Sequence, residues 1–182
     1  LKGRAIIHKD NHKKWEEAKE RNEKVKDNLF KFAFVRNPYT RTLSAFLYLQ
    51  RANKIDKKHS FNEWIINTFR LRDKGIKGPR EFPRNLKSSK YGEAIKENSF
   101  HINAHLQPQI TSFYDQNVDF VGHLESMEES WECVCNFLKI DLKLEWTNKA
   151  PKKQLVKDYY KDGSIQTVKE RYSADFEYLG YS

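Results

Sequence analysis

The chain has 182 residues, of which 38% are hydrophobic, 32% charged and 14% aromatic, and its net charge is +9. The aromatic content is enough for a packed core and excludes a disordered or collagen-like chain. Two cysteines are too few for a small disulfide scaffold. No apolar stretch approaches the roughly 20 residues of a membrane span, and no signal peptide is recognisable. The sequence therefore predicts a cytoplasmic protein without a membrane span.

The positive charge is unevenly spread along the chain. Residues 1–100 carry 25 Lys and Arg against 12 Asp and Glu, whereas residues 101–182 carry 9 against 13. A basic half indicates a polyanionic partner such as nucleic acid, nucleotide phosphate or acidic polysaccharide. A solvated lysine-rich surface is the alternative.

The first elements in chain order are a helix, a strand and a second helix. Residues 13–28 are highly charged good helix formers and predict an exposed helix. Residues 29–35 are mostly aromatic and β-branched, which predicts a buried strand. Pro38 fits the first turn of a helix whose apolar face includes Leu43 and Phe46.

A further helix and a basic segment follow. Ser60 and Glu63 have the spacing of a capping box at a helix start. Residues 70–90 contain eight Lys and Arg, two acids and several Gly and Pro, which is typical of a functional or mobile loop.

The C-terminal half predicts a second strand and two helices. Residues 118–122 form the strand, residues 124–138 an amphipathic helix with acids in its first turn, and a closing helix starts from an N-cap at Ser164. Cys133 and Cys135 are expected to be buried free thiols on that amphipathic helix. Alternating strands and helices predict a single α/β domain with a parallel sheet flanked by helices.

The turn after the first strand is the best candidate site. Open α/β sheets place anions where a strand ends and a helix begins, because helix N–H groups point there. Arg36 can grip a phosphate with two parallel hydrogen bonds, Ser44 can donate a hydroxyl and Arg41 adds positive charge. The alternative is a surface arginine beside a core strand.

Three ordered segments carry a resemblance to a known family. They are FKFAFVRNPYTRTLSAF at residues 30–46, His105-Leu-Gln-Pro-Gln followed by VDFVGHLESMEESWE at residues 118–132, and YYKDGSIQTVKERYSADFEYLGY at residues 159–181. Together they resemble the carbohydrate sulfotransferases of the Golgi chondroitin/HNK-1 type and their bacterial relatives. The resemblance covers about residues 29–182.

The resemblance implies a function, a fold and a donor site. It implies transfer of a sulfuryl group from 3′-phosphoadenosine 5′-phosphosulfate to a hydroxyl, usually of a sugar, on a parallel sheet similar to that of P-loop kinases. By position, Arg36 and Ser44 would hold the donor's 3′-phosphate. Lys149 would contact the adenosine or its phosphate, or else belong to a solvated run of charge. The acceptor would be a glycan, and the basic 70–90 loop could contact an anionic one.

Several histidines are candidates for the general base that takes the acceptor's proton. His105 lies in a matched motif, and a neutral imidazole suits this task near pH 7. A structural histidine is the alternative. His8 lies at a position loosely like the catalytic histidine of the uronyl 2-O-sulfotransferases. The other candidates are His12 and His101, while Glu125 could orient a base and His123 replaces an arginine common in the family.

The sequence departs from the family before Arg36. The loop that holds the donor's 5′-phosphosulfate should follow a first strand there, and residues 1–35 do not match it. The N-terminal strand and its loop are therefore expected to be missing from this chain, by truncation in the first place; the alternative is that an unfamiliar segment binds the 5′-phosphate. Truncation of a membrane anchor would place the chain in the Golgi lumen instead.

Two other hypotheses for the function remain, the first from this departure and the second from the charge alone. The chain could be an inactive relative that binds nucleotide or glycan without turnover. A nucleic-acid-binding protein is the third reading, but the acidic C-terminal half and the absence of a recognised module argue against it. No motif demands a metal.

Overall fold

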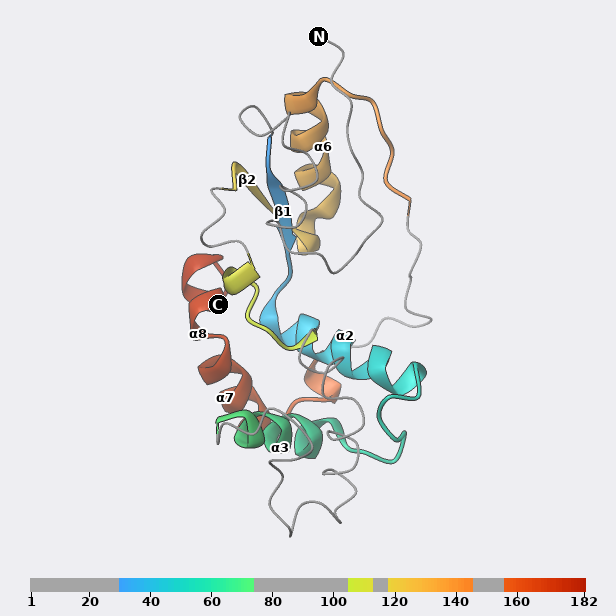
Figure 1. The fold of residues 1–182 in the computed structure, drawn as a ribbon, viewed down its shortest axis with the longest axis vertical. Coiled ribbons are helices and arrows are strands. Elements are labelled where there is room, and N and C mark those ends of the chain that lie inside the picture. The colour runs from blue at the N-terminus through green and yellow to red at the C-terminus, as the bar shows by residue number, and fades with distance from the viewer. Residues whose placement is uncertain (1–29, 74–104, 113–117, 146–155) are drawn as a thin grey trace, which may run out of the picture. The chain divides into compact units, whose positions relative to one another are not determined.

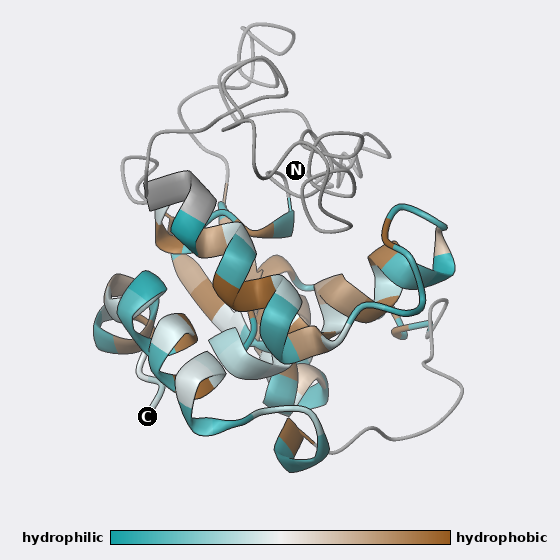
Figure 2. Ribbon diagram, turned by 90° about the horizontal axis from the view of Figure 1, so that it is seen from below, coloured by the Kyte–Doolittle hydropathy of each residue, from teal (hydrophilic) through white to brown (hydrophobic). Residues whose placement is uncertain are grey.

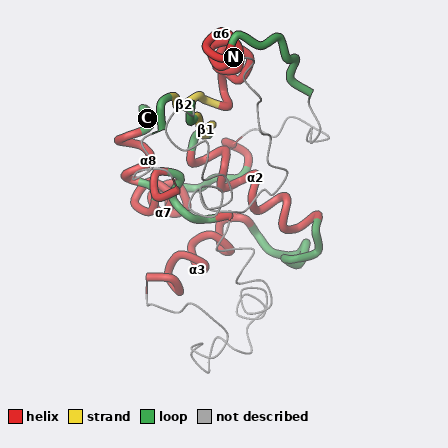
Figure 3. Tube along the Cα trace, turned by 45° about the horizontal axis from the view of Figure 1, so that its top comes forward, coloured by secondary structure: helices red, strands yellow, loops and turns green. Residues whose placement is uncertain are grey.

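The computed structural model of the chain describes residues 30–73, 105–112, 118–145 and 156–182. These residues belong to two compact units: the first holds residues 30–35, 109–112 and 118–145, and the second holds residues 36–73, 105–108 and 156–182. Helices predominate in this part of the chain, and both strands are short (Figure 3). The predicted helix at 13–28 and most of the 70–90 loop lie outside the described residues.

The first unit contains a parallel pair of strands and one helix. Strand β1 (Phe32–Val35) pairs with β2 (Phe120–His123), and Phe32 lies opposite Phe120 in the register. Helix α6 (Met127–Leu138) packs against β2 (Figure 1). The expected α/β class with a parallel sheet is therefore confirmed on a small scale, while the kinase-like topology stays a prediction. A 3₁₀ turn at Leu124–Ser126 precedes α6, so the helix begins three residues later than predicted.

Glycine at position 122 allows α6 to approach the sheet closely. A Cβ atom built on Gly122 would lie 2.7 Å from Cε1 of Phe34 and 2.8 Å from Cβ of Ser130. Ser130 is buried on α6, and its hydroxyl accepts a hydrogen bond from the backbone N–H of His123 at 3.1 Å. The tight strand–helix contact therefore depends on the missing side chain.

The substitution Gly122→Ala should destabilise the fold by about 1–3 kcal/mol, because an inserted methyl group must displace buried neighbours. The matched control is Gly163→Ala in α7 (Asp162–Arg171), where the new Cβ would meet only Cδ1 of Ile66, at 3.5 Å. Alanine in a helix should stabilise this control by up to about 1 kcal/mol. Urea unfolding of both variants checks the prediction, which equal midpoints would contradict.

The second unit is built from helices around one hydrophobic core. Helix α3 (Phe61–Asp73) packs against α7, and α2 (Pro38–Arg51) packs against the same helix, while α8 (Ser173–Tyr178) follows α7 closely. The ribbons alternate between apolar and polar residues, as expected for helices with one buried face (Figure 2). The core residues come from α2, α3 and α7 and from segments between the helices: Leu43, Ala45, Phe46, Leu49, Ile55, Phe61, Trp64, Ile65, Phe69, Leu106, Tyr160, Val168 and Tyr172.

The starts of α2 and α3 agree with the sequence prediction. Asn37 is the N-cap of α2, and its side chain accepts a hydrogen bond from the N–H of Tyr39 at 2.9 Å, with Pro38 as the first helical residue. Helix α3 begins directly after Ser60. Two short 3₁₀ turns complete the described elements: Ile110–Ser112 and Val156–Asp158. No helix in the described ranges is long and apolar enough to cross a membrane.

The prediction of an N-cap at Ser164 is wrong. Helix α7 starts three residues earlier, with Lys161 as its N-cap, and Ser164 occupies the third helical position. Its hydroxyl accepts a hydrogen bond from the N–H of Lys161 at 3.0 Å, so the serine caps the helix from inside the first turn. The side chain of Asn62 on α3 also accepts from that N–H, at 2.9 Å, and this contact favours the earlier start.

The prediction that both cysteines are buried is also wrong. They are free thiols, as expected, but Cys133 is exposed and Cys135 is half-buried. The buried residue between them is Val134. Since successive helical residues are turned by about 100°, the neighbours of a core-facing residue point away from the core on either side.

Candidate functional site

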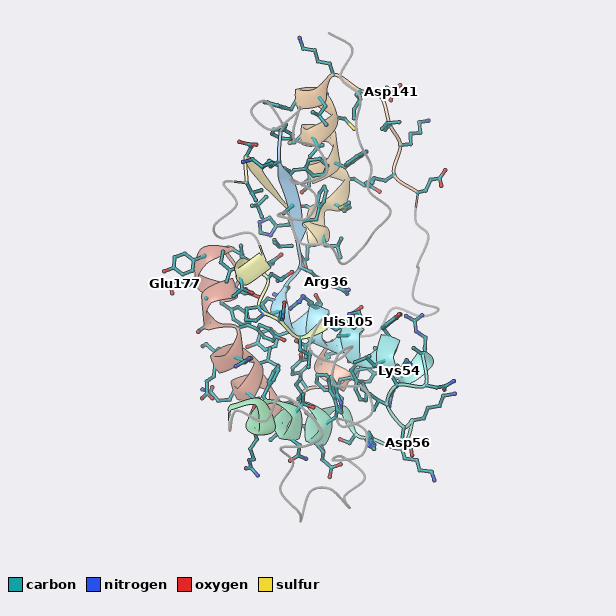
Figure 4. The ribbon with its side chains drawn as sticks, viewed as in Figure 1. Arg36, Lys54, Asp56, His105, Asp141 and Glu177 are labelled. Carbon is teal, nitrogen blue, oxygen red and sulfur yellow. The ribbon has the colours of Figure 1, made fainter. Side chains whose placement is uncertain are left out.

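Arg36 lies at the start of α2, immediately before the N-cap (Figure 4). Its Nε donates a hydrogen bond to the Thr40 hydroxyl at 3.0 Å, and that hydroxyl donates to the carbonyl of Asn37 at 3.0 Å. These bonds orient the guanidinium group on the first turn. The first turn of α2 contains no acidic residue. The positive helix end and Arg36 therefore add together, and both favour an anion.

Arg41 contributes a second guanidinium one turn later. Its Cζ lies 5.8 Å from the centroid of the Tyr172 ring, in a cation–π contact. Its Nη1 is buried and has no hydrogen-bond partner among the described residues. A buried N–H without an acceptor costs free energy. An anionic oxygen bound at Nη1 of Arg41 would supply the acceptor that the described residues do not provide.

Ser44 lies on the same side of α2 as Arg41. Residues three and four apart on a helix are neighbours, so Arg41, Ser44 and Tyr48 form one stripe. Ser44 is half-buried, whereas 47% of the surface of Tyr48 is exposed. The opposite side of α2 carries Leu43 and Phe46 in the core. Ser44 and Tyr48 thus lie on the side away from Leu43 and Phe46, whereas the guanidinium of Arg41 packs on the core residue Tyr172.

His105 lies against this stripe, alongside α2 (Figure 4). Its ring centroid is 5.0 Å from that of Tyr48, with the two planes inclined by 53°. The next residue, Leu106, is fully buried in the core, and its carbonyl accepts a hydrogen bond from the Tyr172 hydroxyl at 3.1 Å. The structure therefore brings His105 to the helix that carries Arg36 and Ser44, although 61 positions separate it from Ser44 in the chain.

A buried tyrosine fixes the first turn of α2 from the core side. The Tyr160 hydroxyl donates to the carbonyl of Tyr39 at 2.9 Å. Burial raises the pKa of Tyr160 far above its usual value, and burial also raises the pKa of Tyr39. Both phenols are therefore neutral at physiological pH, and the Tyr160 hydroxyl keeps the proton that it donates.

The remaining sequence candidates lie either outside the described residues or in the first unit. His8, His12, His101 and Lys149 lie outside the described residues. His123 and Glu125 belong to the first unit, where His123 ends β2 and Glu125 lies in the following 3₁₀ turn. Within the described ranges, no group of three or more His, Cys, Asp or Glu side chains could hold a metal ion.

Sequence reasoning missed Tyr48 and Tyr172. The only local signal for Tyr48 is its spacing of four residues from Ser44, which places both on one helix side. Tyr172 lies in the third matched segment, but no pattern relates it to residues 105 and 106.

The model of a known protein family matches residues 2–182, and that family is described as a sulfotransferase family. The chain belongs to this sulfotransferase family. The match includes α2 and His105, and it extends beyond the three segments that carry the resemblance in sequence. Membership in the sulfotransferase family supports sulfuryl transfer as the chemistry of this chain, with a sulfate donor as its co-substrate. No curated protein and no solved structure matches the chain significantly.

Proposed function

We propose that this sulfotransferase moves a sulfuryl group from 3′-phosphoadenosine 5′-phosphosulfate to a hydroxyl group of a carbohydrate. The observation that carries the proposal is the stripe on α2, where Arg41 has a buried N–H without an acceptor in the described residues, beside Ser44 and one turn after Arg36. Family membership supplies the sulfate donor in general, and the stripe favours a donor that carries an additional phosphate.

Arg36 and two residues of the stripe, Arg41 and Ser44, have separate tasks toward that phosphate. Arg36 supplies charge-assisted hydrogen bonds, which are stronger than neutral ones. Arg41 supplies the second guanidinium, and Ser44 donates one neutral hydrogen bond. Lys149 stays a candidate for the nucleotide, outside the described residues. A phosphate dianion fits this set of donors, because the first turn of α2 carries no carboxylate to repel it.

His105 is proposed as the general base. The acceptor oxygen attacks sulfur while the bond from sulfur to the bridging oxygen of the 5′-phosphate breaks, and adenosine 3′,5′-bisphosphate leaves with the electron pair of that bond. The acceptor's hydroxyl proton passes to the imidazole of His105. His105 is favoured over His8 because it lies beside the stripe on α2, against Tyr48.

The carbohydrate acceptor rests on the three matched motifs, which resemble those of carbohydrate sulfotransferases. The test is transfer from radiolabelled donor to chemically desulfated chondroitin, to heparosan and to dextran, with the full chain. Label in at least one polymer is expected. Stabilisation by adenosine 3′,5′-bisphosphate in a thermal shift assay without any labelled polymer would instead favour the inactive nucleotide-binding relative. Absence of both signals would contradict the donor as well.

Ser44→Ala should weaken binding of adenosine 3′,5′-bisphosphate by about 1 kcal/mol, or about fivefold, because one neutral hydrogen bond is lost. Isothermal titration measures the change. The control is Thr167→Ala, which removes a hydroxyl that bonds the carbonyl of Gly163 within α7 and should leave the affinity unchanged. Equal affinities for the two variants would remove Ser44 from the phosphate site.

A further inference from the structure

Tyr172 makes one contact toward each functional part of the proposed site. It is fully buried at the C-terminal end of α7. The face of its ring carries the guanidinium of Arg41 at 5.8 Å, and its hydroxyl donates to the carbonyl of Leu106 at 3.1 Å. One side chain therefore touches a residue proposed to bind the donor and the backbone next to the proposed base.

These contacts close a ring of side chains around α2. Tyr172 connects Arg41 to Leu106. His105 is the chain neighbour of Leu106 and forms the next link. The centroid of its imidazole ring lies 5.0 Å from that of Tyr48. Tyr48 returns the ring to α2, two turns after Arg41. All of these residues belong to the same unit.

We propose that Tyr172 is a positioning residue that holds His105 at the helix whose residues bind the donor. The inference rests on the proposed function, in which His105 takes the acceptor's proton. The buried side chain of Leu106 anchors this segment to the core, but a side chain alone leaves the peptide plane free to rotate. The hydrogen bond from the Tyr172 hydroxyl to the Leu106 carbonyl fixes that plane. It thereby also fixes the direction of the backbone at His105 and Leu106 beside α2.

The two contacts of Tyr172 can be separated by removing its hydroxyl alone. In Tyr172→Phe the ring can keep its contact with Arg41 and its edge-to-face contact with Phe69, whose centroid is 5.7 Å away. The hydrogen bond to the carbonyl of Leu106 is lost. The control is Ser164→Ala, since Ser164 is also buried and its hydroxyl also donates to a backbone carbonyl, that of Lys161 at 2.8 Å. Both variants should lose stability, because each loses a buried hydrogen bond.

The kinetic test compares the two variants as full chains. Tyr172→Phe should lower the single-turnover rate of sulfuryl transfer by about 10- to 100-fold, because small misplacements of a reacting group are costly. Its dissociation constant for adenosine 3′,5′-bisphosphate should stay at the wild-type value. Ser164→Ala should retain the transfer rate. Equal rates in the two variants would overturn the inference, and so would a loss of donor affinity as large as the loss of rate.

A second measurement does not depend on activity. Nuclear Overhauser effects between the ring protons of His105 and Tyr48, assigned with the His105→Ala variant, should be present in the wild type and in Ser164→Ala. They should weaken or vanish in Tyr172→Phe. Unchanged effects in Tyr172→Phe would overturn the inference. A wild-type chain without any transfer would contradict the proposed function alone, because the ring contact still reports whether Tyr172 positions His105.

Discussion

Arg36→Ala should weaken the binding of adenosine 3′,5′-bisphosphate by about 2–4 kcal/mol, which corresponds to about 30- to 900-fold in the dissociation constant. The guanidinium group is oriented by its bond to Thr40 at 3.0 Å, so little side-chain entropy remains to be lost when phosphate binds. It also stands at the positive end of α2, whose first turn contains no acidic residue. Isothermal titration of the purified chain measures the loss.

Two companion variants make this result specific. Arg51→Ala removes an exposed guanidinium from the last turn of the same helix and should leave the affinity unchanged. Arg36→Lys keeps the charge but loses the planar fork and the Nε bond to Thr40, so its affinity should lie between those of the wild type and Arg36→Ala. Circular dichroism excludes misfolding. An Arg36→Ala chain that binds as tightly as the wild type would remove Arg36 from the site.

His105→Ala should lower the single-turnover rate of transfer by about 10²- to 10⁴-fold, the usual contribution of a general base. Donor affinity should change little, because the phosphate is bound by Arg36, Arg41 and Ser44 rather than by imidazole. The measurement is the rate with radiolabelled donor at saturating acceptor, beside a titration with the bisphosphate product. The expected signature is a loss of rate without a loss of donor binding.

The competing base is tested in the same experiment. His8→Ala should keep the transfer rate if His105 is the base, and a full rate in His105→Ala with none in His8→Ala would assign the base to His8. A purely structural histidine gives a third pattern. Removing the imidazole would then lower the unfolding temperature and weaken both substrates together, because the contact with Tyr48 would serve packing alone.

Local sequence signals predicted much of the second unit and the start of the site. Asn37 and Pro38 mark the beginning of α2, and its apolar spacing predicts the buried face that includes Leu43 and Phe46. Once that face is known, the side that carries Ser44 follows from helix geometry. The motif around these residues was also enough to predict the sulfotransferase family, which the family match confirms.

Two other local signals, the N-cap residue type of Ser164 and the usual burial of cysteine, gave wrong predictions. Ser164 has the residue type of an N-cap, but Asn62 on α3 also binds the N–H of Lys161 and moves the start of α7 forward. Cysteine is most often buried, but Val134 takes the core position between Cys133 and Cys135. The start of α7 thus depends on a contact distant in sequence, whereas the exposure of the cysteines follows from the helix geometry around Val134.

The sequence by itself therefore determined most of the described helices, the parallel strands, the family and the placement of Arg41 and Ser44 on one side of α2. Only the tertiary structure decided that His105 lies beside this stripe. The reason is that a helix stripe depends on contacts three and four residues apart, whereas the position of His105 depends on burial of Leu106 and on a hydrogen bond from Tyr172, 66 positions away. Such a contact forms only when the whole core is assembled, so no local sequence pattern predicts it.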